Sequence, residues 1–487
     1  MGIIIDCFAG GGGASVGIEM ALGRSVDIAV NHDPQAIRMH KTNHPHTLHL
    51  TEDIFKVDLQ KYVAGRHVDL MWASPDCTSH SKAKGGQPRN QGLRILPWAV
   101  YKHAKSILPD VVIMENVEEI QQWGPLDASG RPIKERAGED YNKFVTAMKS
   151  LGYMFDCREL VAADYGAPTT RKRWYAIFRR DGRDIVWPKQ THFKDKEPKW
   201  LQCGDYIDWS DLGTSIFDRK KPLAEKTQAR IAYGIKKYIL DNPDPYVVKD
   251  NKALAYIIQY HGEQKKGESR GQTLSEPIKT IDTSNRYGLV TAFITKFYKT
   301  GIGQSCEAPL HTITTSPGHF GAVSACLVKY YNDPETNNQS IDRPIDTIVT
   351  KDRFGLVSAF LIQYYGREDA MMKCSDPLYT ITTKDRFGLV GVMVDIKGEK
   401  YILADIFLRM LKPEELKVMQ GFPKDYVIDR DYRWKKYPSS EQVKRIGNSV
   451  VPIMAKELVS ANCGYLKVGE RQPIPMLYMD GQQLAFG

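Results

Sequence analysis

Residues 3–22 read IIIDCFAGGGGASVGIEMAL and decide the class of fold. The run from Ile3 to Ile5 predicts a short buried strand, and Ala14 to Leu22 predicts an amphipathic helix. The glycines between them predict a turn in which the backbone can approach a ligand at the helix N-terminus. No lysine follows the last glycine of the cluster, so the turn is not a phosphate-binding loop of the GxxxxGK type. A nucleotide-type cofactor is the natural inference, and a merely tight turn is the alternative.

The alternation of strand and helix continues to about residue 180. Further strands are predicted at 26–30, 68–73, 111–114 and 174–178, and further helices at 33–43 and 96–107. Short buried strands that alternate with helices indicate a parallel α/β sheet. From about residue 406 a helical pattern returns.

The middle of the chain contains an internal repeat. Similar segments begin at Pro277, Pro309, Pro344 and Pro377, at offsets of 32, 35 and 33 residues. Each predicts a strand, a turn and a strand, because runs such as TITT favour β structure and glycine suits the turn. Units of this size cannot bury a core alone, so we expect them to stack on one another.

Basic residues lie on the predicted turns of the repeats. They could read guanine or bind phosphate, but their recurrence at one position of every unit favours a scaffold. These residues are Arg286, His319, Arg353 and Arg386.

Composition limits the class of protein. The chain has 487 residues and a formal net charge of +9, which suggests two or three globular domains and allows an anionic partner such as nucleic acid. The segment Arg158–Lys199 is the densest in positive charge, with 11 Lys or Arg against 6 Asp or Glu. A solvated basic face is the alternative explanation of that segment.

The cysteines and histidines do not predict a metal site. None of the 8 cysteines forms a CxxC pair, so we expect neither a zinc ribbon nor a disulfide framework, and a reducing cytoplasm fits best. His40 and His44 have a helical spacing that could hold zinc, but no cysteine or second acidic ligand joins them, so we expect no metal. The chain starts without a signal-peptide pattern, and no apolar stretch approaches the roughly 18 residues of a membrane span.

Three sets of chemically capable residues lie at the ends of predicted strands. Cys77 stands in a loop directly after 68–73, where α/β enzymes place active sites, although a lone cysteine is more often a small core residue. Glu115 ends the strand at 111–114 and could act as a proton donor or merely cap a helix. Arg171 and Arg173 alternate into the next strand, so we expect both on one side, where they suit a phosphate or a carbonyl that gains negative charge.

The order and spacing of these motifs resemble the C5-cytosine DNA methyltransferases. Two late segments add to the resemblance, RMLKPEEL with QGFP, and GNSV, in which Gly447-Asn448 predicts a turn into a helix. The motifs that carry the resemblance are Phe8–Gly13, Ser74–Cys77, Glu115–Val117, Pro168–Arg173, Arg409–Pro423 and Gly447–Val450.

The resemblance implies a reaction that uses S-adenosyl-L-methionine. In it, Cys77 would attack C6 of cytosine, Glu115 would bind N4 and N3, and Arg173 with Arg171 in support would stabilise O2 or hold the other two groups. The family usually has a second proline where this chain has Asp76. The residues implied in cofactor binding are Phe8, Gly10, Gly12, Asn31, His32, Asp53, Ile54, Asn448 and Val450.

The resemblance also implies an organisation and partners. We expect a Rossmann-like catalytic domain over 1–185, a smaller β-rich target-recognition domain over 190–400 with repeats at 277–390, a return over 405–465, and a surface tail over 470–487. Duplex DNA is the expected substrate, with the target base flipped out of the helix. We expect a cytoplasmic monomer, with a cognate restriction endonuclease as a candidate partner. An RNA (tRNA) cytosine methyltransferase and an inactive DNA-binding protein are the alternatives.

Overall fold

The computed structural model describes residues 2–76, 94–217, 219–248, 253–260, 270–296 and 399–468, with short strands between 320 and 396 and after 477. The chain folds into two compact units. The first unit is Met1–Asp208, Leu274–Arg286 and Leu411–Gly487, and the second is Trp209–Thr273 and Tyr287–Met410. No described helix is both long and apolar enough to cross a bilayer.

A seven-stranded sheet in the order β3-β2-β1-β4-β5-β7-β6 organises the first unit. Its strands are β1 (Ile3–Cys7), β2 (Ile28–Val30), β3 (Leu48–Leu50), β4 (Val68–Ala73), β5 (Val111–Asn116), β6 (Met154–Val161) and β7 (Lys172–Arg179). The predicted α/β class is confirmed, but the sheet is mixed rather than wholly parallel. β1 to β5 run parallel, whereas β7 is antiparallel to both β5 and β6. The connection from β6 to β7 is too short for a parallel crossover, which needs a dozen or more residues.

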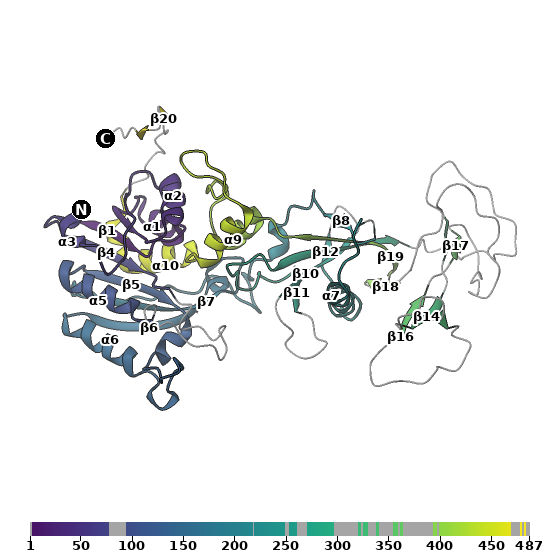
Figure 1. Cartoon of the computed structure of the whole chain (residues 1–487), viewed down its shortest axis with the longest axis horizontal. Helices are drawn as coiled ribbons and strands as arrows, with labels where there is room; N and C mark the ends of the chain where they lie inside the picture. Colours follow the sequence, from purple (N-terminus) through teal and green to yellow (C-terminus); the bar gives the residue numbers. More distant parts are fainter. Residues whose placement is uncertain are drawn as a thin grey trace. The chain divides into compact units, whose positions relative to one another are not determined.

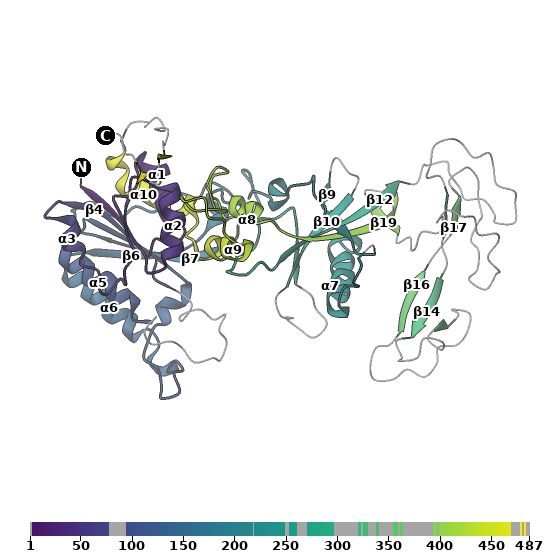
Figure 2. The ribbon, with the colours of Figure 1, turned by 45° about the horizontal axis from the view of Figure 1, so that its top comes forward.

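Helices cover both faces of this sheet (Figures 1 and 2). Ile3 and Ile5 point into the core that α5 and α6 cover, while Ile4 points into the core that α1 and α10 cover. This alternation explains why the β1 run is apolar at every position. The helices of the unit are α1 (Gly13–Leu22), α2 (Pro34–Asn43), α3 (Leu59–Val63), α5 (Leu96–Ile107), α6 (Glu139–Ser150), α8 (Pro413–Met419), α9 (Ser439–Asn448) and α10 (Pro452–Cys463).

A short segment from the middle of the chain, Leu274–Arg286, belongs to the first unit. Ile278 exchanges backbone hydrogen bonds with the stretch before β7, donating to Pro168 O at 3.0 Å and accepting from Thr170 N at 2.8 Å. The Ile278 and Ile281 side chains are fully buried. This segment contains most of the first sequence repeat, so that part of the repeat is built into the first unit.

The second unit is built on an antiparallel sheet with the path β11-β10-β12-β19-β18, to which β8 and β9 add at β19 and β10. Its core lies between the sheet and α7 (Glu225–Ile235), where Ile231 and Ile235 meet the buried Tyr256 and Leu408. The strands are β8 (Thr214–Ser215), β9 (Val247–Val248), β10 (Ala253–Gln259), β11 (Gly271–Thr273), β12 (Tyr287–Lys296), β18 (Met393–Ile396) and β19 (Glu399–Met410).

The sequence repeats have no common pairing pattern in the described strands. β12, β13 and β16 begin at Tyr287, Phe320 and Phe354, the equivalent aromatic residues of the first three repeats. β12 pairs with β10 and β19, β13 pairs with β17, and β16 pairs with β14. The remaining short strands are β13 (Phe320–Ala322), β14 (Ala325–Lys329), β15 (Asn338–Gln339), β16 (Phe354–Ser358), β17 (Leu361–Gln363), β20 (Tyr478–Met479) and β21 (Gln482–Gln483).

Candidate active site

The glycine turn after β1 has one packed side and one open side. Phe8, Gly10 and Gly12 have positive φ angles of 67°, 52° and 92°, a conformation that glycine adopts freely and Phe8 adopts at a cost. A Cβ on Gly12 would lie 2.1 Å from the Tyr426 hydroxyl, and one on Gly13 only 2.1 Å from the carbonyl oxygen of Val450. A Cβ on Gly10 would meet only the carbonyl oxygen of Phe8, at 3.7 Å. The backbone of the turn is therefore accessible from the Gly10 side.

Tyr426 holds this turn from the packed side. Its hydroxyl donates a hydrogen bond to the carbonyl oxygen of Gly11 at 2.6 Å, and the side chain is buried. Tyr426 stands five residues after Gly421 in the stretch that follows α8. The aromatic residue at this position was not predicted to have a role, because nothing in the sequence places it beside a turn more than 400 residues away.

The loops after β2 and β3 lie beside the glycine turn, because β3, β2 and β1 are neighbours in the sheet. Asn31 Oδ1 accepts a hydrogen bond from Asp33 N at 2.8 Å, and Asp33 caps α2 through Gln35 N at 2.8 Å. His32 is exposed at the tip of this loop. Asp53, after β3, is exposed. The predicted cofactor residues after three adjacent strands therefore share one edge of the sheet.

A buried polar chain lies behind the turn. Ser15 Oγ donates to Asp6 Oδ2 at 2.7 Å and lies 2.9 Å from His40 Nε2, and His40 Nδ1 lies 2.9 Å from His49 Nε2. Burial raises the pKa of Asp6 to about 7 and lowers the pKa of His40 well below its usual value. Because Ser15 donates to Asp6, it accepts from His40 Nε2, and a neutral His40 then accepts from His49. His40 and His44, weighed as zinc ligands from their spacing, instead bind Ser15, His49 and Glu19.

The loop after β4 is held by hydrogen bonds up to Pro75, two residues before Cys77. Trp72 Nε1 donates to Ser74 Oγ at 2.7 Å, and Asn116 Nδ2 donates to the carbonyl oxygen of Pro75 at 3.1 Å. Asn116 is fully buried at the end of β5. Cys77 itself lies outside the described residues, which resume at Arg94.

Glu115 and Arg173 meet at the same sheet edge. Arg173 Nε lies 3.3 Å from Glu115 Oε1, and both side chains are nearly buried. β5 and β7 are adjacent and antiparallel, so the end of β5 faces the start of β7. The pair is one strand away from the loop after β4 in which Asn116 holds Pro75.

Arg171 has different partners from Arg173. It precedes β7, and its Nη1 donates to the carbonyl oxygens of Gly447 at 3.1 Å and Ile281 at 3.4 Å. A Cβ on Gly447 would lie 1.9 Å from Asp282 O, so only glycine allows this approach. Arg171 therefore joins three segments of the first unit, whereas the sequence predicted that both arginines would act together.

The last motif is placed differently from its prediction. Gly447 and Asn448 end α9 rather than begin a helix, and α10 begins only at Pro452. Ser449 and Val450, between the two helices, contact the glycine turn, where Ser449 Oγ would lie 3.3 Å from a Cβ on Gly11.

Comparison with known families agrees with this arrangement. The model of the C-5 cytosine-specific DNA methylase family matches residues 3–462. The chain belongs to that family. This membership confirms the predicted family and enzyme class, DNA (cytosine-5-)-methyltransferase, and it implies a reaction that depends on S-adenosylmethionine.

Similar members of the family include bacterial type II methyltransferases. M.AquIA of Picosynechococcus sp. is 28% identical over 196 residues, which are 39% of this chain and 76% of that protein. M1.HphI of Haemophilus parahaemolyticus is 29% identical over 197 residues, 39% of this chain but only 48% of that protein. A solved structure of a DNA modification methyltransferase encoded within an E. coli prophage aligns with 95% of this chain and 98% of its own, at 16% identity and a TM-score of 0.42.

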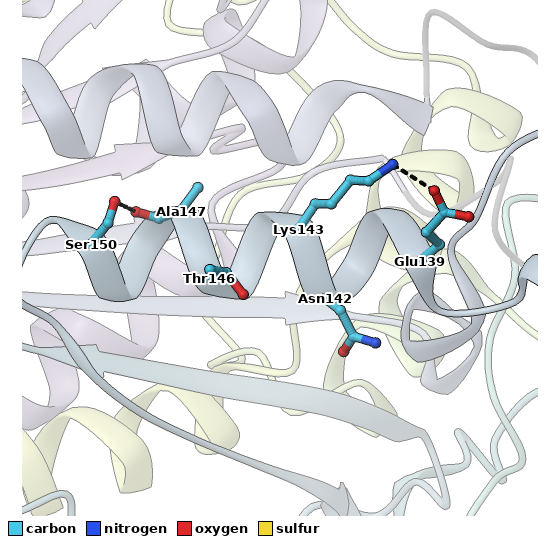
Figure 3. A pocket seen from close by; sticks show the side chains of 6 residues that line it. All are labelled: Glu139, Asn142, Lys143, Thr146, Ala147 and Ser150. Atoms are coloured by element: carbon cyan, nitrogen blue, oxygen red, sulfur yellow. Dashed lines mark hydrogen bonds and ion pairs between the residues drawn. The ribbon is translucent and has the colours of Figure 1, made fainter.

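The predicted DNA contacts are only partly described. Arg286, in the first unit, is half-exposed and lies 3.2 Å from Asp282 through its Nε. His319, Arg353 and Arg386 lie outside the described residues. A separate surface hollow runs along α6, and its lining side chains all come from that one helix (Figure 3). It contains none of the family motifs, and its Lys143 is already paired with Glu139 at 2.7 Å.

Proposed function

We propose that this methylase transfers a methyl group to C5 of a cytosine flipped out of duplex DNA, with Cys77 as its nucleophile. The observation that supports the proposal is the Glu115–Arg173 ion pair, which lies one strand away from the Pro75 carbonyl that Asn116 holds. Family membership gives the class of reaction, and the geometry of the ion pair supports a role for Glu115 and Arg173 in it. An RNA (tRNA) cytosine substrate is the alternative that the experiment below also tests.

The chemistry needs three groups because C5 of cytosine is a poor nucleophile inside the aromatic ring. The Cys77 thiolate would add to C6 and break the aromaticity, which makes C5 resemble an enamine carbon. Glu115 would hydrogen-bond N4 and protonate N3, so that the charge of the adduct is neutralised. Arg173 would orient Glu115 and stabilise O2. C5 then takes the methyl group, after which loss of the C5 proton and expulsion of the Cys77 thiolate restore the ring and the N3 proton returns to Glu115.

The residues of the site fit S-adenosylmethionine, which supplies the methyl group when it is bound. The Gly10 side of the glycine turn is open to a ligand, and the backbone there can approach it closely. We assign the remaining contacts to groups at the same sheet edge, to the last residue of α9 and to the segment that follows it. They are Phe8, Gly12, Asn31, His32, Asp53, Ile54, Asn448 and Val450.

The second unit and the remaining middle of the chain are proposed to recognise the target sequence. A base inside a duplex is inaccessible to Cys77, so the DNA must be gripped while the cytosine is extruded. We propose that three arginines of the repeats mainly hold the repeats together and contact DNA only as a secondary role. They are Arg286, Arg353 and Arg386. The similarity to type II methyltransferases suggests a cognate restriction endonuclease as a partner in the cell.

The test is transfer of labelled methyl groups to duplex DNA and to tRNA. The wild type should label DNA and not tRNA, and Cys77→Ala should lose all transfer. Cys157→Ala is the matched control, because Cys157 is a half-buried free thiol on β6 and should be dispensable. Equal labelling by wild type and Cys77→Ala would refute the nucleophile, and labelling of tRNA alone would refute the substrate. Bisulfite sequencing of DNA from expressing cells would then show the methylated sequence.

A further inference from the structure

The loop Asp429–Lys436, between α8 and α9, is closed by one buried side chain. Asp431 is almost fully buried, and its Oδ1 accepts hydrogen bonds from the backbone of Arg433 and Lys435, both at 2.9 Å. The backbone bonds Asp431 N to Lys435 O, at 3.0 Å, and Trp434 N to Asp431 O, at 2.8 Å, complete the turn. We call these residues, 429–436, the tip loop. Its conformation is fixed by the loop itself.

The tip loop presents an aromatic side chain to solvent. Trp434 is 70% exposed, more than any other large apolar side chain that the structure describes. Its φ angle is +62°, a left-handed conformation that a bulky residue adopts only under strain. Neither burial nor backbone preference explains a tryptophan here. Residues held in such sparsely populated backbone conformations cluster at active sites and ligand contacts.

Positive charge surrounds this tryptophan. Arg433, Lys435 and Lys436 are exposed on either side of it, and the Arg430 guanidinium lies 4.7 Å from the centre of its ring. Of the two acidic residues of the loop, Asp431 is buried in backbone hydrogen bonds and Asp429 pairs with Arg430 at 3.5 Å, so the net positive charge of the surface comes from Arg433, Lys435 and Lys436. Exposed cations interleaved with an aromatic ring are the composition of surfaces that bind nucleic acid.

The tip loop is part of the same unit as the candidate active site. Just before it, Val427 exchanges two hydrogen bonds with Asn43 at the end of α2, at 2.8 and 2.9 Å. Just after it, α9 leads directly to Asn448 and the glycine turn, and Figure 1 shows the loop region beside that helix. α9 ends at the predicted cofactor residue Asn448, and α2 begins two residues after the predicted cofactor residue His32.

We propose that the tip loop is a DNA contact separate from the reacting base. Its lysines and arginines bind phosphates of the duplex beside the target, and Trp434 packs its free face on a sugar or base of the same stretch. This inference rests on the proposed function, because it assumes that duplex DNA is the substrate. Phosphate contacts of this kind position the protein without reading sequence.

The test measures DNA binding by fluorescence anisotropy over a range of salt concentrations, with methyl transfer assayed in parallel. Replacing Lys435 and Lys436 together by alanine should make the negative slope of log K against log salt shallower by about 1.8, because each phosphate contact contributes about 0.9 to its magnitude. Lys61→Ala/Lys105→Ala is the matched control, since it removes equal charge from exposed positions of α3 and α5 and should leave the slope unchanged.

Trp434→Gly separates a contact from a structural role. Glycine relieves the positive φ, so the melting temperature should stay the same or rise, while the DNA affinity falls about tenfold. Trp434→Phe keeps a ring and should restore most of the affinity. For all of these variants, the rate at saturating DNA should stay near that of the wild type.

The outcomes distinguish this inference from the proposed function. If the wild type methylates DNA and the tip-loop variants bind it with unchanged affinity and slope, the DNA contact is refuted and the proposed function stands. If only the melting temperature of Trp434→Gly falls, the residue is structural and the inference fails. A wild type that neither binds nor methylates duplex DNA would overturn both.

Discussion

Gly447→Ala should break the hydrogen bonds by which Arg171 joins three segments of the first unit. A Cβ at this position would lie 1.9 Å from Asp282 O and 2.3 Å from Asp282 C, and both are backbone atoms that cannot rotate away. One of the two segments must move by about 1 Å before the contact becomes tolerable. That movement breaks the bonds from Arg171 to the carbonyls of Gly447 and Ile281. Charge-assisted bonds contribute about 1.5–3 kcal/mol each, and alanine returns about 1 kcal/mol of helix propensity. The net loss of unfolding free energy should be about 3 kcal/mol.

Gly464→Ala is the control for this experiment. Gly464 follows α10 with a φ of −56°, and a Cβ added there would have no described atom within 4 Å, so alanine should stabilise the protein by about 0.5 kcal/mol. Urea unfolding followed by circular dichroism gives both free energies, and calorimetry gives the affinity for S-adenosylmethionine. The affinity should also fall in Gly447→Ala, because Asn448 and Val450 follow directly. If the two variants have unfolding free energies within about 1 kcal/mol of each other, the packing argument is wrong.

Three further changes test the site. Tyr426→Phe removes the hydrogen bond to Gly11 O and should weaken S-adenosylmethionine binding about fivefold by calorimetry, and a change below about twofold would contradict this role. Glu115→Gln should lower kcat about 100-fold with little change in DNA affinity, and an equal loss of both would place Glu115 in DNA binding instead. Burial lowers the pKa of His49 to about 4, so between pH 6.5 and 4 the unfolded chain binds a proton there that the folded chain does not. Acidification through that window should therefore lower the free energy of unfolding of the wild type by about 3 kcal/mol more than that of His49→Gln, as measured by urea unfolding. If the free energies of the two proteins change equally with pH, this prediction is wrong.

The fold of the first unit was predictable where hydrophobic runs were short and bounded by glycine or polar residues. The strand at Ile3 and the helices at 33–43 and 96–107 were found within one or two residues, because local pattern decides them. β6 was missed, since its sequence MFDCRELV is half-polar and its side chains are mostly exposed or half-buried. The direction of β7 was predicted wrongly, because strand direction depends on the connection and not on the strand's own residues.

The residues of the candidate site also divide into those that local sequence could predict and those that it could not. Glu115 and Arg173 could be predicted because a motif at a strand end fixes where a side chain emerges, and the structure brings the two together. The separate role of Arg171 could not be predicted, because its partners come from residue 281 and residue 447. Tyr426 was missed for the same reason. Contacts between distant segments depend on packing that no local pattern encodes.

The inclusion of Leu274–Arg286 in the first unit affects how the proposed recognition region could be exchanged with that of a relative. A transplant of the whole stretch between residues 209 and 410 would remove the carbonyl that Arg171 binds at Ile281, along with the buried Ile278. A viable chimaera would need four junctions, so that 209–273 and 287–410 are replaced as two inserts around a retained host segment. During synthesis on the ribosome, the first unit likewise cannot complete its packing until the residues after 410 have emerged, long after its own first 208 residues.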